Sequence, residues 1–169
     1  MGKISLGSVD IKKIALAAVD LKKISLGAVQ IWAGITNGAY LLTSNFIPVN
    51  SATTRNVIPV SVNSGVGYES FPVSGSGAIR LPAGSYVLNM GWNSVGFRTD
   101  WKAGGVSMPS GEAVTVPNPN VGSAGAMTFS VPFTMTAEGD VSIITSVASA
   151  SASNRTISTA SFSATIALA

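Results

Sequence analysis

Cysteine and histidine are both absent from the 169 residues of this chain. Without cysteine there is no disulfide and no thiolate, either as a metal ligand or as a nucleophile. Without histidine the chain lacks the commonest general base and metal ligand, and Ser-His-Asp and Cys-His triads are excluded. Charged residues are also scarce, at 10% of the chain. These absences predict a protein that is not an enzyme and that needs no cofactor.

The residues that are present favour β-structure and turns. Hydrophobic residues make up 46% of the chain, and Gly, Ser, Thr and Asn are abundant among the rest. The net charge of +3 lies within residues 1–36, where five lysines stand against Asp10 and Asp20; residues 37–169 hold five basic and five acidic residues. Such an excess favours docking of this segment on an acidic partner and argues against nucleic-acid binding. No signal peptide and no stretch of roughly 20 apolar residues is visible, so we expect synthesis in the cytoplasm without membrane insertion.

Residues 3–32 repeat every ten residues in the pattern K-I-[SA]-L-[GA]-[SA]-V-[DQ]-[IL]-[KW]. On a helix Ile4 and Leu6 would lie about 200° apart, and one continuous strand would reverse its apolar face between Leu6 and Val9. The pattern therefore predicts three-residue strands separated by two-residue corners such as 12–13 and 22–23. The apolar positions of this docking arm are Ile4, Leu6, Val9, Ile11, Ile14, Leu16, Val19, Leu21, Ile24, Leu26, Val29, Ile31 and Trp32.

Strands this short need partners to bury their faces. The repeat leaves four arrangements open: pairing with copies in other subunits, a small solenoid, packing on a larger protein, or an ordinary meander of the main domain. The runs KKI-x-LG and V-DIKKI, ending in V-Q-I-W, resemble repeats near the termini of minor tail and fibre proteins of tailed phages, especially those of actinobacteria. They are also loosely similar to pentapeptide repeats. The phage resemblance covers residues 3–32 and implies a virion protein that docks on other virion components through residues 1–36.

Asn37-Gly38 is a turn signal and marks the expected boundary between the arm and a body of residues 37–169. Short apolar runs then alternate with Gly, Pro and Asn clusters, and no window shows a helical period. The pattern predicts an all-β sandwich or jelly roll. We read Gly104-Gly105 as one of the breaks between strands. The expected strands are residues 39–47, 56–62, 67–73, 77–81, 85–93, 96–102, 112–116, 126–135, 140–149 and 156–168.

Three stretches of the body resemble the C1q/TNF-like jelly roll: Ile79 to Tyr86 with its Pro82-Ala83-Gly84 turn, the Gly139-Asp140 strand start, and the closing strand from Ser161 to Ile166. The Gly- and Pro-rich stretch 103–125 departs from that family. The resemblance implies a homotrimer, with the terminal strand near the threefold axis, that binds ligands rather than catalysing a reaction.

One cluster has the composition of a carbohydrate site, because exposed rings stack on sugars beside polar groups. Its residues are Asn93, Phe97, Arg98, Asp100 and Trp101. The alternative places the two aromatic rings in the core and pairs Arg98 with Asp100 at the surface. Glu138 and Asp140 flank a turn, either as solvated acids or as part of a Ca²⁺ site.

These observations lead to one main hypothesis and two alternatives. The main hypothesis is a structural protein of a phage virion, a minor tail or fibre component that is anchored by its arm and displays a β-sandwich for assembly or adhesion to a host-surface glycan. The alternatives are a capsid head-decoration or head-fibre protein, and a soluble lectin-like module.

Overall fold

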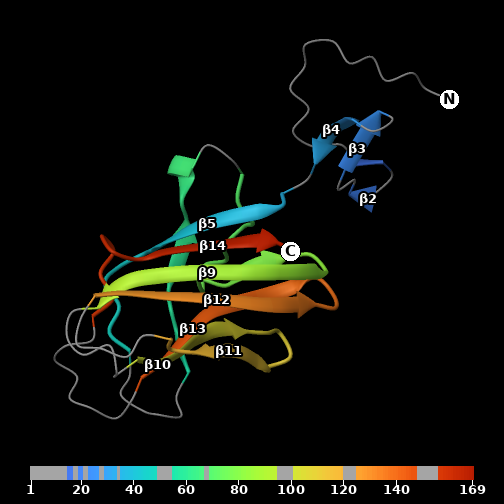
Figure 1. The fold of residues 1–169 in the computed structure, drawn as a ribbon. Helices are drawn as coiled ribbons and strands as arrows, with labels where there is room; N and C mark the ends of the chain where they lie inside the picture. Colours follow the sequence, from blue (N-terminus) through green and yellow to red (C-terminus); the bar gives the residue numbers. More distant parts are fainter. Residues whose placement is uncertain are drawn as a thin grey trace. The chain divides into compact units, whose positions relative to one another are not determined.

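The computed structural model describes residues 15–16, 19–20, 23–26, 29–33, 35–48, 55–66, 69–94, 101–119, 125–147 and 156–169. The chain divides into two compact units, Met1–Thr36 and Asn37–Ala169, which coincide with the expected arm and body. Strands dominate both units (Figure 1), and the helical structure of the described residues is limited to the 3-10 turn Ser64–Val66. The all-β prediction is confirmed.

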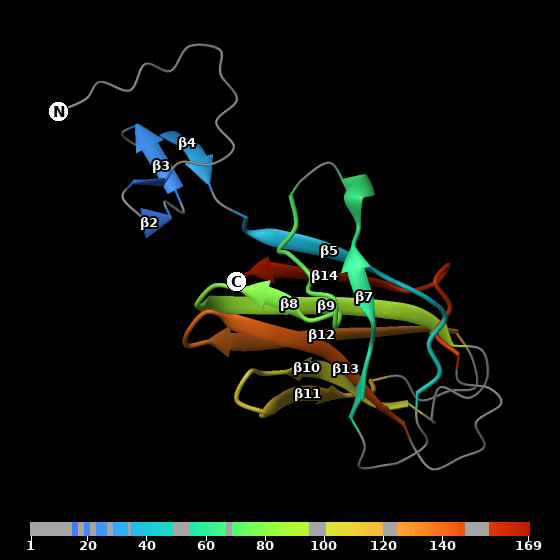
Figure 2. The same ribbon diagram turned by 180° about the vertical axis from the view of Figure 1, so that it is seen from behind.

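Two antiparallel sheets form the body (Figures 1 and 2). The first, which we call the β9 sheet, has the strand order β12 (Gly125–Met135), β9 (Gly84–Ser94), β14 (Ser163–Leu168), β5 (Asn37–Leu42) and β7 (Val60–Val62). The second, the β13 sheet, runs from β11 (Ala113–Pro117) to β10 (Trp101–Ser107) and β13 (Gly139–Val147), and both β6 (Asn56–Val57) and β8 (Ile79–Leu81) pair with β13.

The chain crosses from one sheet to the other at almost every connection after β8. Only β10 and β11 follow each other within one sheet, and their hairpin register runs from Ala103 opposite Pro117 to Ser107 opposite Ala113. The terminal strand β14 lies between β5 and β9, so the two ends of the body chain meet in one sheet. This winding is that of a jelly roll, as the sequence pattern predicted.

The core lies between the two sheets, and β9 shows why. Tyr86, Leu88, Met90 and Trp92 alternate with polar or small residues, and all four are at most 4% exposed. Alternate residues of a strand point to the same face, so one face of β9 is wholly apolar. Burial of such side chains contributes about 1.5–3 kcal/mol each relative to exposure.

Strand β10 runs through Gly104-Gly105, where the sequence predicted a break. A Cβ atom on Gly104 would lie 2.8 Å from Cγ of Phe129 and would also meet Cε of Met90, both on the β9 sheet. A Cβ atom on Gly105 would lie 2.8 Å from the Cα atom of Thr115 in β11. Glycine is therefore needed at both positions because neighbouring groups approach closely, and not because the chain turns.

The Asn37-Gly38 pair also differs from its prediction, because it opens β5 instead of forming a turn. Gly38 pairs with Ile166 of β14, and a Cβ atom on Gly38 would lie 2.7 Å from Cζ of Tyr40. The ring of Tyr40 thus covers the glycine on the same face of the strand. An aromatic ring over a glycine is a recognised way to fill the space that the missing side chain leaves.

Several predicted strands are shorter than expected. The predicted strand 39–47 ends at Leu42, and the predicted strand 56–62 is divided into β6 and β7. In the predicted strand 67–73, residues 69–72 form no strand and Val73 makes only an isolated bridge to Ile79. In the predicted strand 156–168, regular pairing begins at Ser163, because the segment before it turns. There the amide of Phe162 donates to the carbonyl of Ser158, and the amide of Thr159 donates to the side chain of Asn45. Such local hydrogen bonds compete with the sheet ladder.

The described part of the arm consists of two hairpins. Strand β1 (Ala15–Leu16) pairs with β2 (Val19–Asp20), and β3 (Lys23–Leu26) pairs with β4 (Val29–Ala33). The two form separate two-stranded sheets. The predicted corners 17–18 and 27–28 lie between paired strands, whereas Lys23, predicted at a corner, is the first residue of β3. In the described residues, the arm therefore consists of short antiparallel strands that pair with one another.

Candidate assembly surfaces

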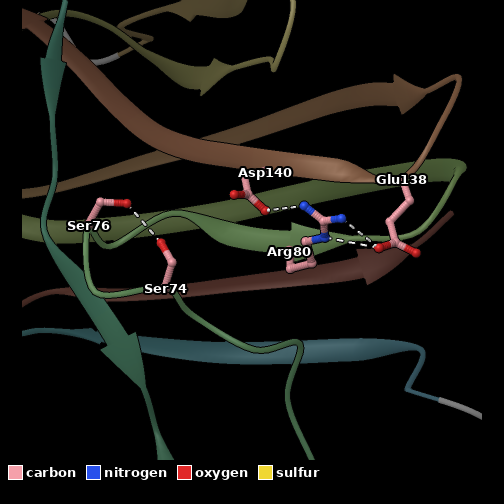
Figure 3. A network of polar contacts seen from close by, with 5 residues as sticks. All are labelled: Ser74, Ser76, Arg80, Glu138 and Asp140. Carbon is pink, nitrogen blue, oxygen red and sulfur yellow. Dashed lines mark hydrogen bonds and ion pairs between the residues drawn. The ribbon is translucent and has the colours of Figure 1, made fainter.

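Three charged side chains meet where β8 pairs with β13 (Figure 3). Arg80 lies opposite Asp140 in the register, and its Nη1 atom is 3.2 Å from Asp140 Oδ1. Its Nη2 atom is 2.9 Å from Glu138 Oε1 in the turn before β13. Hydrogen bonds to Glu138, and then to Asp140, raise the pKa of Arg80. Because the guanidinium occupies both carboxylates, these acids form a surface clamp and not a calcium site.

The clamp brings together the two acids that the sequence analysis considered for calcium binding. In the described residues, no group of three or more His, Cys, Asp or Glu side chains is placed to hold a metal ion. Beside the clamp, in the turn that precedes β8, the hydroxyl oxygens of Ser74 and Ser76 lie 2.8 Å apart (Figure 3). This corner of the body has the polar contacts of an ordinary solvated turn.

In the predicted carbohydrate cluster, the Trp101 ring is buried. Trp101 is 1% exposed and packs against Trp92 with 5.0 Å between ring centroids, so it is not available to stack on a sugar. A register shift between Trp101 and Ala103 explains the difference, because a bulge reverses which residues of β10 point inward. Asn93 is exposed on β9. Residues 97, 98 and 100 lie outside the described part of the chain.

The buried rings at this end of the core form one cluster. Trp92 lies 5.2 Å from Phe129 and 6.4 Å from Phe162, centroid to centroid, in stacked arrangements. Its Nε1 atom is buried without a hydrogen-bond partner, a cost of about 1–3 kcal/mol. The energetic role of these rings is therefore packing between the sheets.

The β9 sheet carries no charged residue in any of its five strands. The charged residues of the described body lie elsewhere: Arg80, Lys102 and Asp140 are in the β13 sheet, and the others are in connecting segments (Arg55, Glu69, Glu112 and Glu138). A surface of a small soluble domain ordinarily mixes both signs of charge. The outer face of the β9 sheet therefore differs from an ordinary solvated surface.

Two rows of small residues cross the middle of this face. Asn89 of β9 lies opposite Ser130 of β12 and Thr165 of β14. In the next row Gly91 lies between Thr128 and Ser163. Apart from the half-buried Gly91, these residues are exposed, and they line a shallow hollow together with Pro119 and neighbouring atoms of the sheet. We call this surface the hydroxyl face.

The apolar positions of the arm fall into equivalent places in the two hairpins. Leu16 lies opposite Val19 in β1–β2, and Leu26 lies opposite Val29 in β3–β4. These four residues are related by the ten-residue repeat, so one repeat corresponds to one hairpin. Ile24 lies opposite Trp32, and the register shifts between Ile24 and Ser25. Among the proposed docking positions, residues 4, 6, 9, 11, 14 and 21 lie outside the described part of the chain.

No protein-family model matches this chain, and a search of curated proteins found no match. In the described residues, no helix is long and apolar enough to cross a membrane. The hydroxyl face was missed by sequence reasoning, although a signal for it exists. The expected strands 85–93 and 126–135 contain no charged residue, and their positions of the parity opposite to the core are mostly Ser, Thr and Asn.

Proposed function

We propose that this chain is a structural protein of a tailed-phage virion, a minor tail or fibre component. Its arm attaches to the particle, and its body associates as a homotrimer that contributes to assembly or to host adhesion. The observation that carries the proposal is the arm, in which each of the two ten-residue repeats that the structure describes contains one hairpin. A two-stranded hairpin is at best marginally stable in water, so a segment built from them is suited to binding another chain.

The hydroxyl face supports self-association of the body. Burying an unpaired charge in an interface is costly, whereas hydroxyl and amide groups can exchange hydrogen bonds with polar groups of a neighbouring copy. Strands lie about 4.8 Å apart and rise about 3.3 Å per residue, so the area of the β9 sheet is on the order of 600 Å². A standard protein–protein interface buries about 800 Å² of surface on each partner. Small side chains also allow two sheets to approach closely.

Two measurements test this function. Size-exclusion chromatography with light scattering should give the mass of a trimer at micromolar concentration, and a monomer there contradicts the assembly of the body. Deletion of residues 1–33 should leave a folded body, checked by circular dichroism, that no longer joins phage particles. Undiminished incorporation of the deleted chain contradicts anchoring by the arm. Separation of heads from tails before detection distinguishes a tail component from a head-decoration or head-fibre protein, which would use its arm in the same way.

A further inference from the structure

In the part of the arm that the structure describes, each hairpin is paired only within itself, so its two outer edges carry no further strand. In a hairpin closed by a two-residue connection, the closing pair exchanges both of its backbone hydrogen bonds, and the next pair points its N–H and C=O groups outward. That next pair is Ser25 and Gln30 in β3–β4, and Ala15 and Asp20 in β1–β2. Among the described arm residues, no third strand joins either hairpin. Both hairpins therefore present unpaired backbone groups along their sides.

We propose that the arms of several copies of this chain pair with one another through these open edges and form a shared β-sheet. Three or more strands with one apolar face are the smallest sheet that is stable by itself. The two hairpins have the same pairing in the two residue pairs next to their connections, so a hairpin from a second copy offers the same spacing of backbone groups there. The paired positions of β3 and β4 include the apolar residues Ile24, Leu26, Val29 and Trp32, and a sheet shared between copies would bury apolar surface that a lone hairpin leaves in water.

Two features favour a second copy as the occupant over an unrelated protein. The first is the repeat itself, because the same edge recurs every ten residues and is complementary to itself. The second is the point at which the arm joins the body. Thr36 is followed directly by β5, and Asn37 pairs with Ala167 of β14 within the β9 sheet. This second feature rests on the proposed trimer. If copies meet through the β9 sheet, the junctions between their arms and bodies lie near one another.

The absence of cysteine allows a direct test in the full-length chain. Ala33→Cys places one thiol in β4, and Thr136→Cys places one in the exposed turn between β12 and β13 as the control. A short bismaleimide should link A33C chains to one another and leave T136C chains single on a denaturing gel. Equal, low linkage of both variants contradicts pairing of the arms.

Proximity alone would also give cross-links, so a second pair of variants removes only the edge donors. In the A33C background, Ser25→Pro with Gln30→Pro deletes the two outward N–H groups and keeps the inner ladder, because proline is tolerated at such edge positions. Ser25→Thr with Gln30→Thr is the matched control that keeps both donors. We expect linkage to fall about tenfold in the proline variant, since each lost hydrogen bond contributes about 0.5–1.5 kcal/mol. Equal linkage in the proline and threonine variants would overturn the inference.

The outcomes also separate this inference from the proposed function. If A33C fails to link while deletion of residues 1–33 still prevents incorporation, the arm binds a different virion protein, and only the pairing of arms is refuted. If A33C links while light scattering of the deleted chain gives a monomer, the pairing of arms stands, and trimerisation through the body is refuted.

Discussion

The two sheets of the body share one core, but their outer faces differ in chemistry. The β13 sheet carries Arg80, Lys102 and Asp140, whereas the β9 sheet has no charged side chain and presents Ser, Thr and Asn. Charged side chains keep an exposed surface soluble. A charged side chain that becomes buried in an interface without an oppositely charged partner is costly. The difference teaches which face of the sandwich is suited to meet another protein. Substitutions can test first the packing that holds the two sheets together and then the contrast between their outer faces.

The largest effect is expected where the two sheets approach most closely. Gly104→Ala places a methyl group 2.8 Å from Cγ of Phe129 on the opposite sheet, and such overpacking typically costs about 1–3 kcal/mol. Since Gly104 contacts a rigid ring, we expect the upper part of this range, measured as the free energy of unfolding in urea. A stability equal to that of the wild type would show that the sheets can separate without cost.

Gly111→Ala is the matched glycine control. Gly111 lies in the turn between β10 and β11 with a φ of 82° and no atom within 4 Å of an added Cβ. Only the left-handed backbone opposes the substitution, at about 1 kcal/mol. If G111A is more destabilising than G104A, close packing is not the reason for glycine in β10.

The second prediction compares the same substitution on the two outer faces. Thr165→Lys adds a charge to the hydroxyl face, and Thr115→Lys adds one to the exposed face of β11. A buried unpaired charge at an interface costs about 2–5 kcal/mol, so T165K should weaken the proposed trimer by more than tenfold while T115K should leave it unchanged. Light scattering over a concentration series measures both. Equal behaviour of the two variants would mean that the hydroxyl face is not the interface.

The elements of the fold differ in how well the sequence predicts them. Strand β9 was predictable because Tyr86 to Trp92 alternate with period two, and the ten-residue repeat similarly indicated short strands in the arm while leaving their pairing open. Strand β10 was not, because the need for glycine at 104 arises from Phe129, which lies far along the chain. The sequence offered burial of the Trp101 ring as one alternative, which the structure confirms, but the bulge that turns this ring inward has no signature in the sequence. Local pattern thus reveals faces and turns, and contacts between distant residues remain hidden.

The third prediction concerns the inner side of the β9 sheet at alkaline pH. Burial raises the pKa of Tyr86 above 10.0, and its hydroxyl donates to the carbonyl of Pro82 at 2.9 Å. A raised pKa means that the folded state holds the proton more tightly than the unfolded state. This stabilisation is complete below the unfolded pKa and is lost as pH rises through the folded value.

Tyr86→Phe separates the two contributions of this hydroxyl. The variant should lose about 0.5–1.5 kcal/mol at neutral pH through the missing hydrogen bond. It should also lose less stability than the wild type between pH 9 and pH 11, because the group that titrates is gone. Thermal unfolding followed by circular dichroism at several pH values measures both effects. An identical alkaline decline in the two proteins would assign that decline to other groups.

The smallest effect is expected at the clamp on the β13 sheet. Arg80, Glu138 and Asp140 are about half exposed, with side-chain exposures of 54%, 61% and 48%, and water screens such pairs. Arg80→Met keeps most of the aliphatic stem and removes the charge, so the midpoint of thermal unfolding should not change measurably. The raised pKa of Arg80 adds no pH dependence near neutrality, because the guanidinium is charged in both the folded and the unfolded state. A clear loss of stability in R80M would show instead that charge on the β13 sheet is structural, and the contrast between the sheets would then no longer indicate which face meets a partner.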